Sequence, residues 1–168
     1  MNSNSLVAVG AGLILLGSVA AASAKSNQEF LTDAIQGNLV EISLGQLAQK
    51  NGGSDGVRSF GQMLVQDHSA ANEKAKSLAQ AQGLTLPTAP KPEAKTVFDR
   101  LSKLNGDNFD KEFAKHMVAD HKKDIAEFEA QAKGGDEVAS FAKDTLPTLQ
   151  KHLQTAQSLA SGKPVQQQ

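Results

Sequence analysis

The 168-residue sequence contains no cysteine, tryptophan or tyrosine, and phenylalanine is its only aromatic residue. Without cysteine the chain can form no disulfide, no thiolate metal site, no cysteine nucleophile and no lipid-modified N-terminal cysteine. It also carries little net charge, −1 at pH 7, and has no long run of lysine or arginine. A nucleic-acid partner is therefore not expected, because contact with phosphates needs a concentrated basic surface.

Sequence patterns of the common enzyme classes are missing as well. There is no glycine-rich phosphate loop, no nucleophile elbow around a serine and no His-Glu-x-x-His motif. Paired catalytic carboxylates are not evident either. Hydrolase and nucleotide-binding functions have no support, and an enzyme is not the expected class.

Helix-forming residues are what the chain has in abundance: alanine, glutamine, leucine, lysine and glutamate dominate its composition. The length suits one domain with one hydrophobic core. These two features predict a single all-α domain.

The N-terminal segment has the pattern of an export signal. Residues 6–22 form an uncharged, apolar run, and the first charge after it is Lys25. The small residues Ala22 and Ala24 fit the requirements of signal peptidase, so cleavage after Ala24 is predicted. The mature protein is then expected to be exported, to a periplasm or the cell envelope.

An uncleaved membrane anchor is the alternative for residues 1–24. Residues 1–5 contain no lysine or arginine side chain, although an export signal normally has some. The apolar run is short for a spanning helix, which needs about 20 residues. Contact with a membrane is expected only through this segment, and only if it is retained.

Four long helices and one short helix are predicted in a domain spanning residues 25–161. Glycine, asparagine and proline separate the segments, which have helical periodicity. The predicted helices are residues 29–50, 55–82, 93–104, 108–133 and 136–161. Residues 84–92 contain three prolines and are expected to be extended, and residues 162–168 to be a disordered tail. Pro147 is expected to kink the last helix, or to end it near Thr145 before a restart.

An internal repeat suggests how the helices are connected. Residues 55–60 (DGVRSF) match residues 136–141 (DEVASF), and without a gap residues 77–79 match residues 158–160. A duplicated helical hairpin joined by a long crossover is the ferritin-like arrangement. The predicted fold is therefore a ferritin-like four-helix bundle whose long crossover carries the short extra helix.

Each long helix places one polar residue on its apolar face: Glu41, His68, His121 and His152, in chain order. Counted from the ends of the helices at a rise of about 1.5 Å per residue, all four fall within roughly 10 Å of one another along the bundle axis. They are expected to meet near its middle.

Asp67 and Asp120 each precede one of these histidines and lie at the border of the apolar face. They are candidates for orienting an imidazole on a neighbouring helix, as the outer hydrogen-bond partners of metal ligands do.

Two interpretations of the cluster remain open. Imidazole nitrogens and a carboxylate oxygen suit one transition-metal ion, such as zinc, iron, manganese or copper. Alternatively, the four side chains form a buried polar cluster and satisfy one another by hydrogen bonds. A buried carboxylate needs partners in either case, because leaving it unpaired costs several kcal/mol.

Four segments resemble the signature of an exported bacterial family known as domain of unknown function four-one-four-two. These are residues 60–72 (FGQMLVQDHSAAN), 101–110 (LSKLNGDNFD), 117–121 (MVADH) and 145–153 (TLPTLQKHL). The resemblance covers about residues 30–160, and the motifs are specific in combination. It implies a ferritin-like helical bundle with an export signal, of a kind often described as an outer-membrane or periplasmic protein, and no established reaction.

The resemblance also bears on the polar cluster. His68, His121 and His152 fall on histidine motifs of the family, and Glu41 falls on its first-helix acidic position. Ferritin-type di-iron sites use a Glu-x-x-His pair on two helices, and here Val65 and Leu149 occupy the carboxylate places. One metal ion, or none, is therefore expected rather than a di-iron oxidase or iron-storage centre.

Three functions are consistent with these features. The first is an exported metal-binding bundle that serves metal handling or stress tolerance. The second is a non-catalytic envelope-stress or interaction protein with a structural histidine cluster. The third, with the least support, is a metal-dependent redox enzyme.

Overall fold

The computed structural model describes residues 24–162 of the chain. The predicted export segment, apart from its last residue Ala24, and the predicted tail beyond Gly162 lie outside the described residues. Within them the chain forms five helices and no β-strand, so the all-α class is confirmed. The helices are α1 (Asn27–Asn51), α2 (Asp55–Ala81), α3 (Pro92–Leu101), α4 (Gly106–Gln131) and α5 (Glu137–Ala160).

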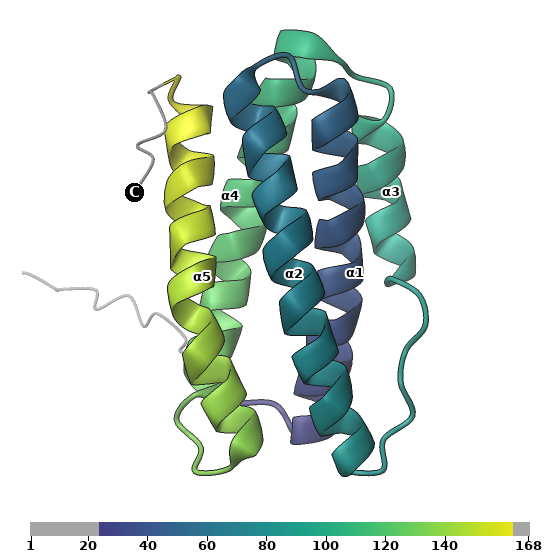
Figure 1. Ribbon diagram of the computed structural model, residues 1–168, viewed down its shortest axis with the longest axis vertical. Coiled ribbons are helices and arrows are strands. Elements are labelled where there is room, and N and C mark those ends of the chain that lie inside the picture. Colours follow the sequence, from purple (N-terminus) through teal and green to yellow (C-terminus); the bar gives the residue numbers. More distant parts are fainter. Residues whose placement is uncertain (1–23, 163–168) are drawn as a thin grey trace, which may run out of the picture.

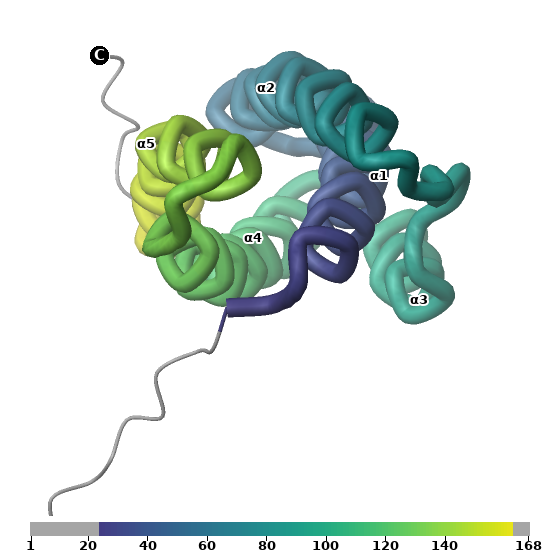
Figure 2. The backbone as a smooth tube through the Cα atoms, turned by 90° about the horizontal axis from the view of Figure 1, so that it is seen from below, coloured from purple at the N-terminus to yellow at the C-terminus, as the bar shows by residue number. Residues whose placement is uncertain are grey.

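The four long helices lie side by side as a bundle, and α3 packs outside it next to α1 (Figures 1 and 2). Going around the bundle in Figure 2, the order is α1, α2, α5 and α4. Helices α1 and α5 run in one direction while α2 and α4 run in the other (Figure 1). The chain between α2 and α4 must therefore return along the whole length of the bundle, and residues 82–105, including α3, do so.

The helix ends follow local sequence signals. The side chain of Ser26 accepts a hydrogen bond from the backbone of Glu29, which caps its backbone in return, and this reciprocal pair starts α1 two residues earlier than predicted. At the starts of α2 and α5 the cap is one-sided: the side chains of Ser54 and Asp136 each accept a hydrogen bond from a backbone N–H of the first turn, with no bond in return. All five helices lie within a few residues of their predicted limits.

Helix α5 continues through Pro147 from Glu137 to Ala160. The predicted end near Thr145 with a restart is therefore wrong. Proline removes the hydrogen bond that its own N–H would give to the carbonyl of Lys143. Both residues are exposed, so water can satisfy that carbonyl and the helix tolerates the loss.

Helices α1 and α2 approach each other most closely at Gly45 and Gly61. A Cβ added at Gly61 would lie 2.6 Å from the carbonyl oxygen of Gly45, and one added at Gly45 would lie 2.7 Å from the carbonyl oxygen of Gly61. Such distances leave no room for a side chain. The two glycines therefore set the spacing between the helices that carry Glu41 and His68.

The interior consists of two hydrophobic clusters separated by a polar layer. One cluster, around Phe60 and Phe113, fills the end of the bundle where α1 turns into α2. The other, around Phe30 and Phe141, fills the opposite end. The buried polar residues of the middle layer come from all four long helices: Asn38, Glu41, His68, Asn72, His121 and His152.

None of the helices in residues 24–162 is long and apolar enough to span a membrane.

Candidate metal centre

Three histidines from three different helices meet in the polar layer. His68 lies on α2, His121 on α4 and His152 on α5, and all three are buried, the last two with no exposed surface. One nitrogen of each imidazole lies within 4.8 Å of the corresponding nitrogens of the other two. The structure thus brings together three of the four side chains for which a common depth was predicted.

Each imidazole donates one N–H to an acceptor outside the cluster. His68 Nδ1 donates to the Asn38 side-chain oxygen at 2.8 Å, and His121 Nδ1 donates to the Met117 carbonyl oxygen at 3.1 Å. His152 Nε2 donates to a carboxylate oxygen of Asp67 at 2.9 Å. Because these three acceptors have no proton to give, the network fixes the tautomer of every imidazole.

The inner nitrogens are therefore lone-pair acceptors. Three neutral imidazoles have three N–H groups, and the outward hydrogen bonds use all of them. His121 Nε2 and His152 Nδ1 face each other at 3.3 Å, and His68 Nε2 has no hydrogen-bond partner among the described residues. The cluster lacks a positive centre, which either an added proton or a metal cation would supply.

The surroundings oppose the added proton. Burial lowers the pKa of His68 well below its usual value, and the neighbouring imidazoles lower it further. Burial, followed by His152, lowers the pKa of His121 to about 4. Burial also lowers the pKa of His152, although Asp67 works in the opposite direction. At neutral pH the three imidazoles are uncharged, which is the form that binds metal.

The spacing of the inner nitrogens suits a metal ion. Two nitrogens bound to one tetrahedral zinc ion at 2.0–2.1 Å are separated by about 3.3 Å, and His121 Nε2 and His152 Nδ1 have this separation. One ligand nitrogen of His68 lies within 4.8 Å of those of the other two histidines, so the three imidazoles are close enough to be candidates for holding one ion. The outer acceptors are those that orient metal-bound imidazoles in proteins.

Glu41 lies apart from the nitrogen cluster. Its side chain is 1 % exposed, and it faces Asp120 of α4 within hydrogen-bonding reach, with Asp124 farther along the same helix. Neither carboxylate oxygen of Glu41 accepts a hydrogen bond from a donor among the described residues. Asp120 is itself an acid, so the two side chains can form a hydrogen bond only when they share a proton. Burial and the nearby Asp120 raise the pKa of Glu41 well above its usual value.

The two predicted outer partners differ in their surroundings. Asp67 of α2 accepts the hydrogen bond from His152 of α5 and so reaches a neighbouring helix. Asp120 of α4 forms no hydrogen bond to an imidazole in the described part of the chain. It faces Glu41 instead, and acts on His121 only through its charge, which raises the pKa of that imidazole against the effect of burial.

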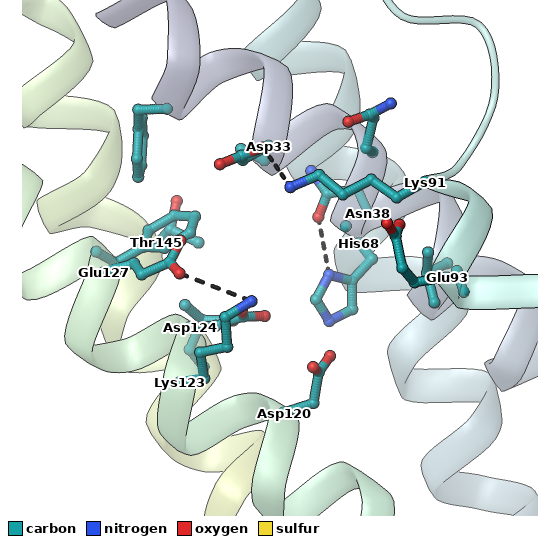
Figure 3. Close-up of a pocket in the computed structure, with 18 of the residues that line it drawn as sticks. Asp33, Asn38, His68, Lys91, Glu93, Asp120, Lys123, Asp124, Glu127 and Thr145 are labelled. Atoms are coloured by element: carbon teal, nitrogen blue, oxygen red, sulfur yellow. Dashed lines mark hydrogen bonds and ion pairs between the residues drawn. The ribbon is translucent and has the colours of Figure 1, made fainter. Parts of the chain in front are cut away.

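A cavity of about 470 Å³ opens between α1, α3 and α4 and extends inward to His68. Figure 3 shows His68 at its inner side, with Asp120 and Asp124 projecting from α4. The mouth carries ion pairs, in which Asp33 contacts Lys25 and Lys91. The cavity gives water or a small cation a route to the histidine cluster.

Two residues of this region were not expected from the sequence. Asn38 precedes Glu41 by one helical turn on the buried face of α1 and orients His68. Asp124 lies one turn after Asp120 on α4, and burial, followed by Asp120, raises its pKa to about 7. Asn38 is an uncharged amide and Asp124 is one of several acids on α4, so neither stands out in the sequence. The signal that could have found them is their position, one helical turn from Glu41 and from Asp120.

Comparison with protein-family models gives a match over residues 16–159 to the family described as domain of unknown function (DUF4142). The chain belongs to the DUF4142 family. The family resemblance inferred from the motifs is thereby confirmed. Curated proteins and solved structures gave no match to the chain.

The DUF4142 match includes every residue of the cluster. It contains α1 to α4 and almost all of α5, together with the three histidines and the outer acceptors Asn38 and Asp67. The DUF4142 description gives no activity, so the function must be argued from the geometry of the site.

Proposed function

We propose that this protein binds one transition-metal ion through His68, His121 and His152, and that it serves metal handling or stress tolerance in the cell envelope. The convergence of three imidazole lone pairs supports the proposal most strongly. Each imidazole has its other nitrogen tied to an outward acceptor, and a cation is the simplest partner for the inner nitrogens. Catalytic turnover is not part of the proposal.

The donor set favours particular metals. Three neutral imidazoles in a buried layer suit zinc, copper, cobalt or nickel better than magnesium or calcium, which prefer oxygen ligands. Iron is also consistent with this donor set, because imidazole binds iron, whereas manganese fits it less well, because manganese prefers oxygen ligands. A water molecule reaching the centre through the cavity beside His68 would occupy the position that three imidazoles leave open on a tetrahedral ion.

The test is a metal titration of the purified protein without an affinity tag. We expect one zinc ion to bind per chain, with a rise in melting temperature, because the ion binds the folded state only. The variant His121→Gln should bind zinc at least about a hundredfold more weakly, because an amide is a poor zinc ligand. His116→Gln changes a half-buried histidine that precedes His121 by five residues on the same helix and should retain the wild-type affinity.

Two outcomes would contradict this function. One is a folded wild-type protein whose melting temperature no transition metal changes. The other is equal weakening of zinc binding in the His116 and His121 variants, which would place the ion elsewhere. Either result would favour the alternative, a structural polar cluster in an envelope-stress or interaction protein.

We also propose that the bundle is of the ferritin-like type. Support comes from the helix directions, with α1 and α5 opposed to α2 and α4, and from the long connection between α2 and α4. In this topology, side chains from facing helices meet in the middle of the bundle and can act together as metal ligands. Metal sites of bundle proteins occupy that place.

Export is the remaining part of the proposal, and the apolar run followed by Ala22 and Ala24 supports it. When the chain is produced with its own N-terminal segment in a bacterium, the soluble envelope fraction should contain a protein that begins at Lys25. Mass spectrometry of the intact protein measures this directly. A full-length chain that sediments with membranes would support the uncleaved anchor, and a full-length chain in the cytoplasm would contradict export.

A further inference from the structure

Glu41 presents the largest unpaired polar group in the interior. Its carboxylate is 1 % exposed, and neither oxygen accepts a hydrogen bond from a donor among the described residues. An isolated buried carboxylate costs several kcal/mol. The metal proposed for the histidines does not relieve this cost, because the group of mutually close ligand atoms contains only the three imidazoles.

The groups that face Glu41 are acids. Across the space between α1 and α4 it meets Asp120, and Asp124 lies farther along α4. Neither aspartate forms an ion pair with any residue of the described part of the chain, whereas Asp33 and Glu127 at the mouth of the cavity both pair with Lys25. Lys25 thus forms ion pairs with the outer acids only. Lys123 and Lys25 also lower the pKa of Asp124 through their charge, but burial and Asp120 have the larger effect and raise it.

The cavity connects the two aspartates of α4 to solvent, whereas Glu41 is buried and is not one of its lining residues. Asp120 and Asp124 line it, and its volume of about 470 Å³ is much larger than one ion. In Figure 3 both side chains project from α4 toward the side where His68 lies. A hydrated cation can therefore approach the carboxylates through the opening between α1, α3 and α4, with water molecules completing its coordination.

We propose that Glu41 and Asp120, assisted by Asp124, bind a hard divalent cation at a second site, separate from the histidine cluster. Oxygen ligands from carboxylates and water suit manganese, magnesium, calcium or ferrous iron, whereas imidazoles select softer borderline ions. The unpaired oxygens of Glu41 provide the inner ligand, and the acids of α4 provide the outer ones. The site does not require an ion at the histidines.

The alternative state of these acids is a shared proton. A protonated Glu41 could donate one hydrogen bond to Asp120, and burial favours the protonated form of both Glu41 and Asp124. A cation must displace that proton, so binding should strengthen as pH rises. A proton-sharing pair of acids would bind no hard cation, whereas the proposed site would bind one, so a binding measurement distinguishes the two states.

Manganese provides the probe, because its free aqueous ion is counted by electron paramagnetic resonance. Metal-free protein is first given one equivalent of zinc to fill the histidine cluster and is then titrated with manganese at pH 7.5. We expect about one manganese ion to bind per chain. Glu41→Gln, which keeps the side-chain shape, should weaken this binding at least tenfold, and Asp124→Asn should weaken it as well.

Two controls separate the sites. Glu129→Gln makes the same chemical change at an exposed position of α4 and should leave manganese binding unchanged. His152→Ala should lose zinc while retaining manganese affinity within about threefold. Failure of zinc binding with retained manganese binding would therefore overturn the proposed function and leave this second site intact.

The second site would be disproved by folded wild-type protein that takes up no manganese at pH 7.5, which would leave a proton-sharing carboxyl pair. It would also be disproved if Glu41→Gln, with an unchanged helical circular dichroism spectrum, bound manganese as well as the wild type. Manganese binding that disappears in His152→Ala would contradict the separation of the two sites.

Discussion

Replacing Gly61 with alanine is expected to lower the free energy of unfolding by about 2–3 kcal/mol, the upper part of the usual range for overpacking a tight contact. The added Cβ would lie 2.6 Å from the Gly45 carbonyl oxygen and 2.8 Å from the Ala48 Cβ. Backbone and Cβ atoms cannot rotate away, so α1 and α2 must separate. The better helix propensity of alanine, about 1 kcal/mol, offsets only part of this cost.

Gly37→Ala is the matched control for this effect. It makes the same change on α1, but a Cβ there would meet nothing within 4 Å. The variant should therefore gain about 0.5–1 kcal/mol through helix propensity. Denaturant unfolding of the two variants measures both values, and two changes of the same sign would refute the close contact between α1 and α2.

Moving α1 and α2 apart should also weaken metal binding. Asn38 and His68 connect α1 to α2 by a hydrogen bond of 2.8 Å, and this bond fixes the tautomer that turns Nε2 inward. If Gly61→Ala moves the helices apart, zinc affinity should fall together with stability. In Gly37→Ala the affinity should stay at the wild-type value.

Acid should destabilise the metal-free protein through its buried histidines. The pKa of His121 is about 4 in the folded protein, below its usual value of about 6.5 in an unfolded chain. Between these values the unfolded chain binds more protons, so stability falls as the pH falls below about 6.5. From pH 7 to pH 4.5 this single group should contribute a loss of about 2.5 kcal/mol.

Measuring this contribution needs a comparison, because other groups titrate in the same range. The raised pKa values of Glu41 and Asp124 act in the opposite direction and stabilise the folded protein as acid protonates them. His121→Leu replaces the imidazole with an apolar side chain that cannot be protonated, and so removes this group from the titration. Its unfolding free energy, measured with a chelator present, should fall by about 2.5 kcal/mol less than that of the wild type between pH 7 and pH 4.5. Parallel curves for the two proteins would show that His121 is not buried in its neutral form.

The sequence alone determined the helices and the depth of the polar layer. Periodicity, capping residues and glycine stops are local signals, because they act within one or two helical turns. For the same reason the sequence placed His68, His121 and His152 on inward faces at one level. The outcome at Pro147 was not determined locally, since it depended on whether this part of α5 faces solvent, and Lys143 and Pro147 are both exposed.

Only the tertiary structure decided which polar groups touch. A helical wheel gives the direction of each side chain from its own axis, but the distances between helices depend on contacts such as that of Gly45 with Gly61. These distances bring three imidazoles within 4.8 Å of one another, and they leave Glu41 opposite Asp120. The sequence predicted one set of four inward residues, and the structure divides it into a histidine cluster and a separate carboxylate group. The reason is that the distances between helices depend on packing contacts between distant parts of the chain, which local sequence patterns do not specify.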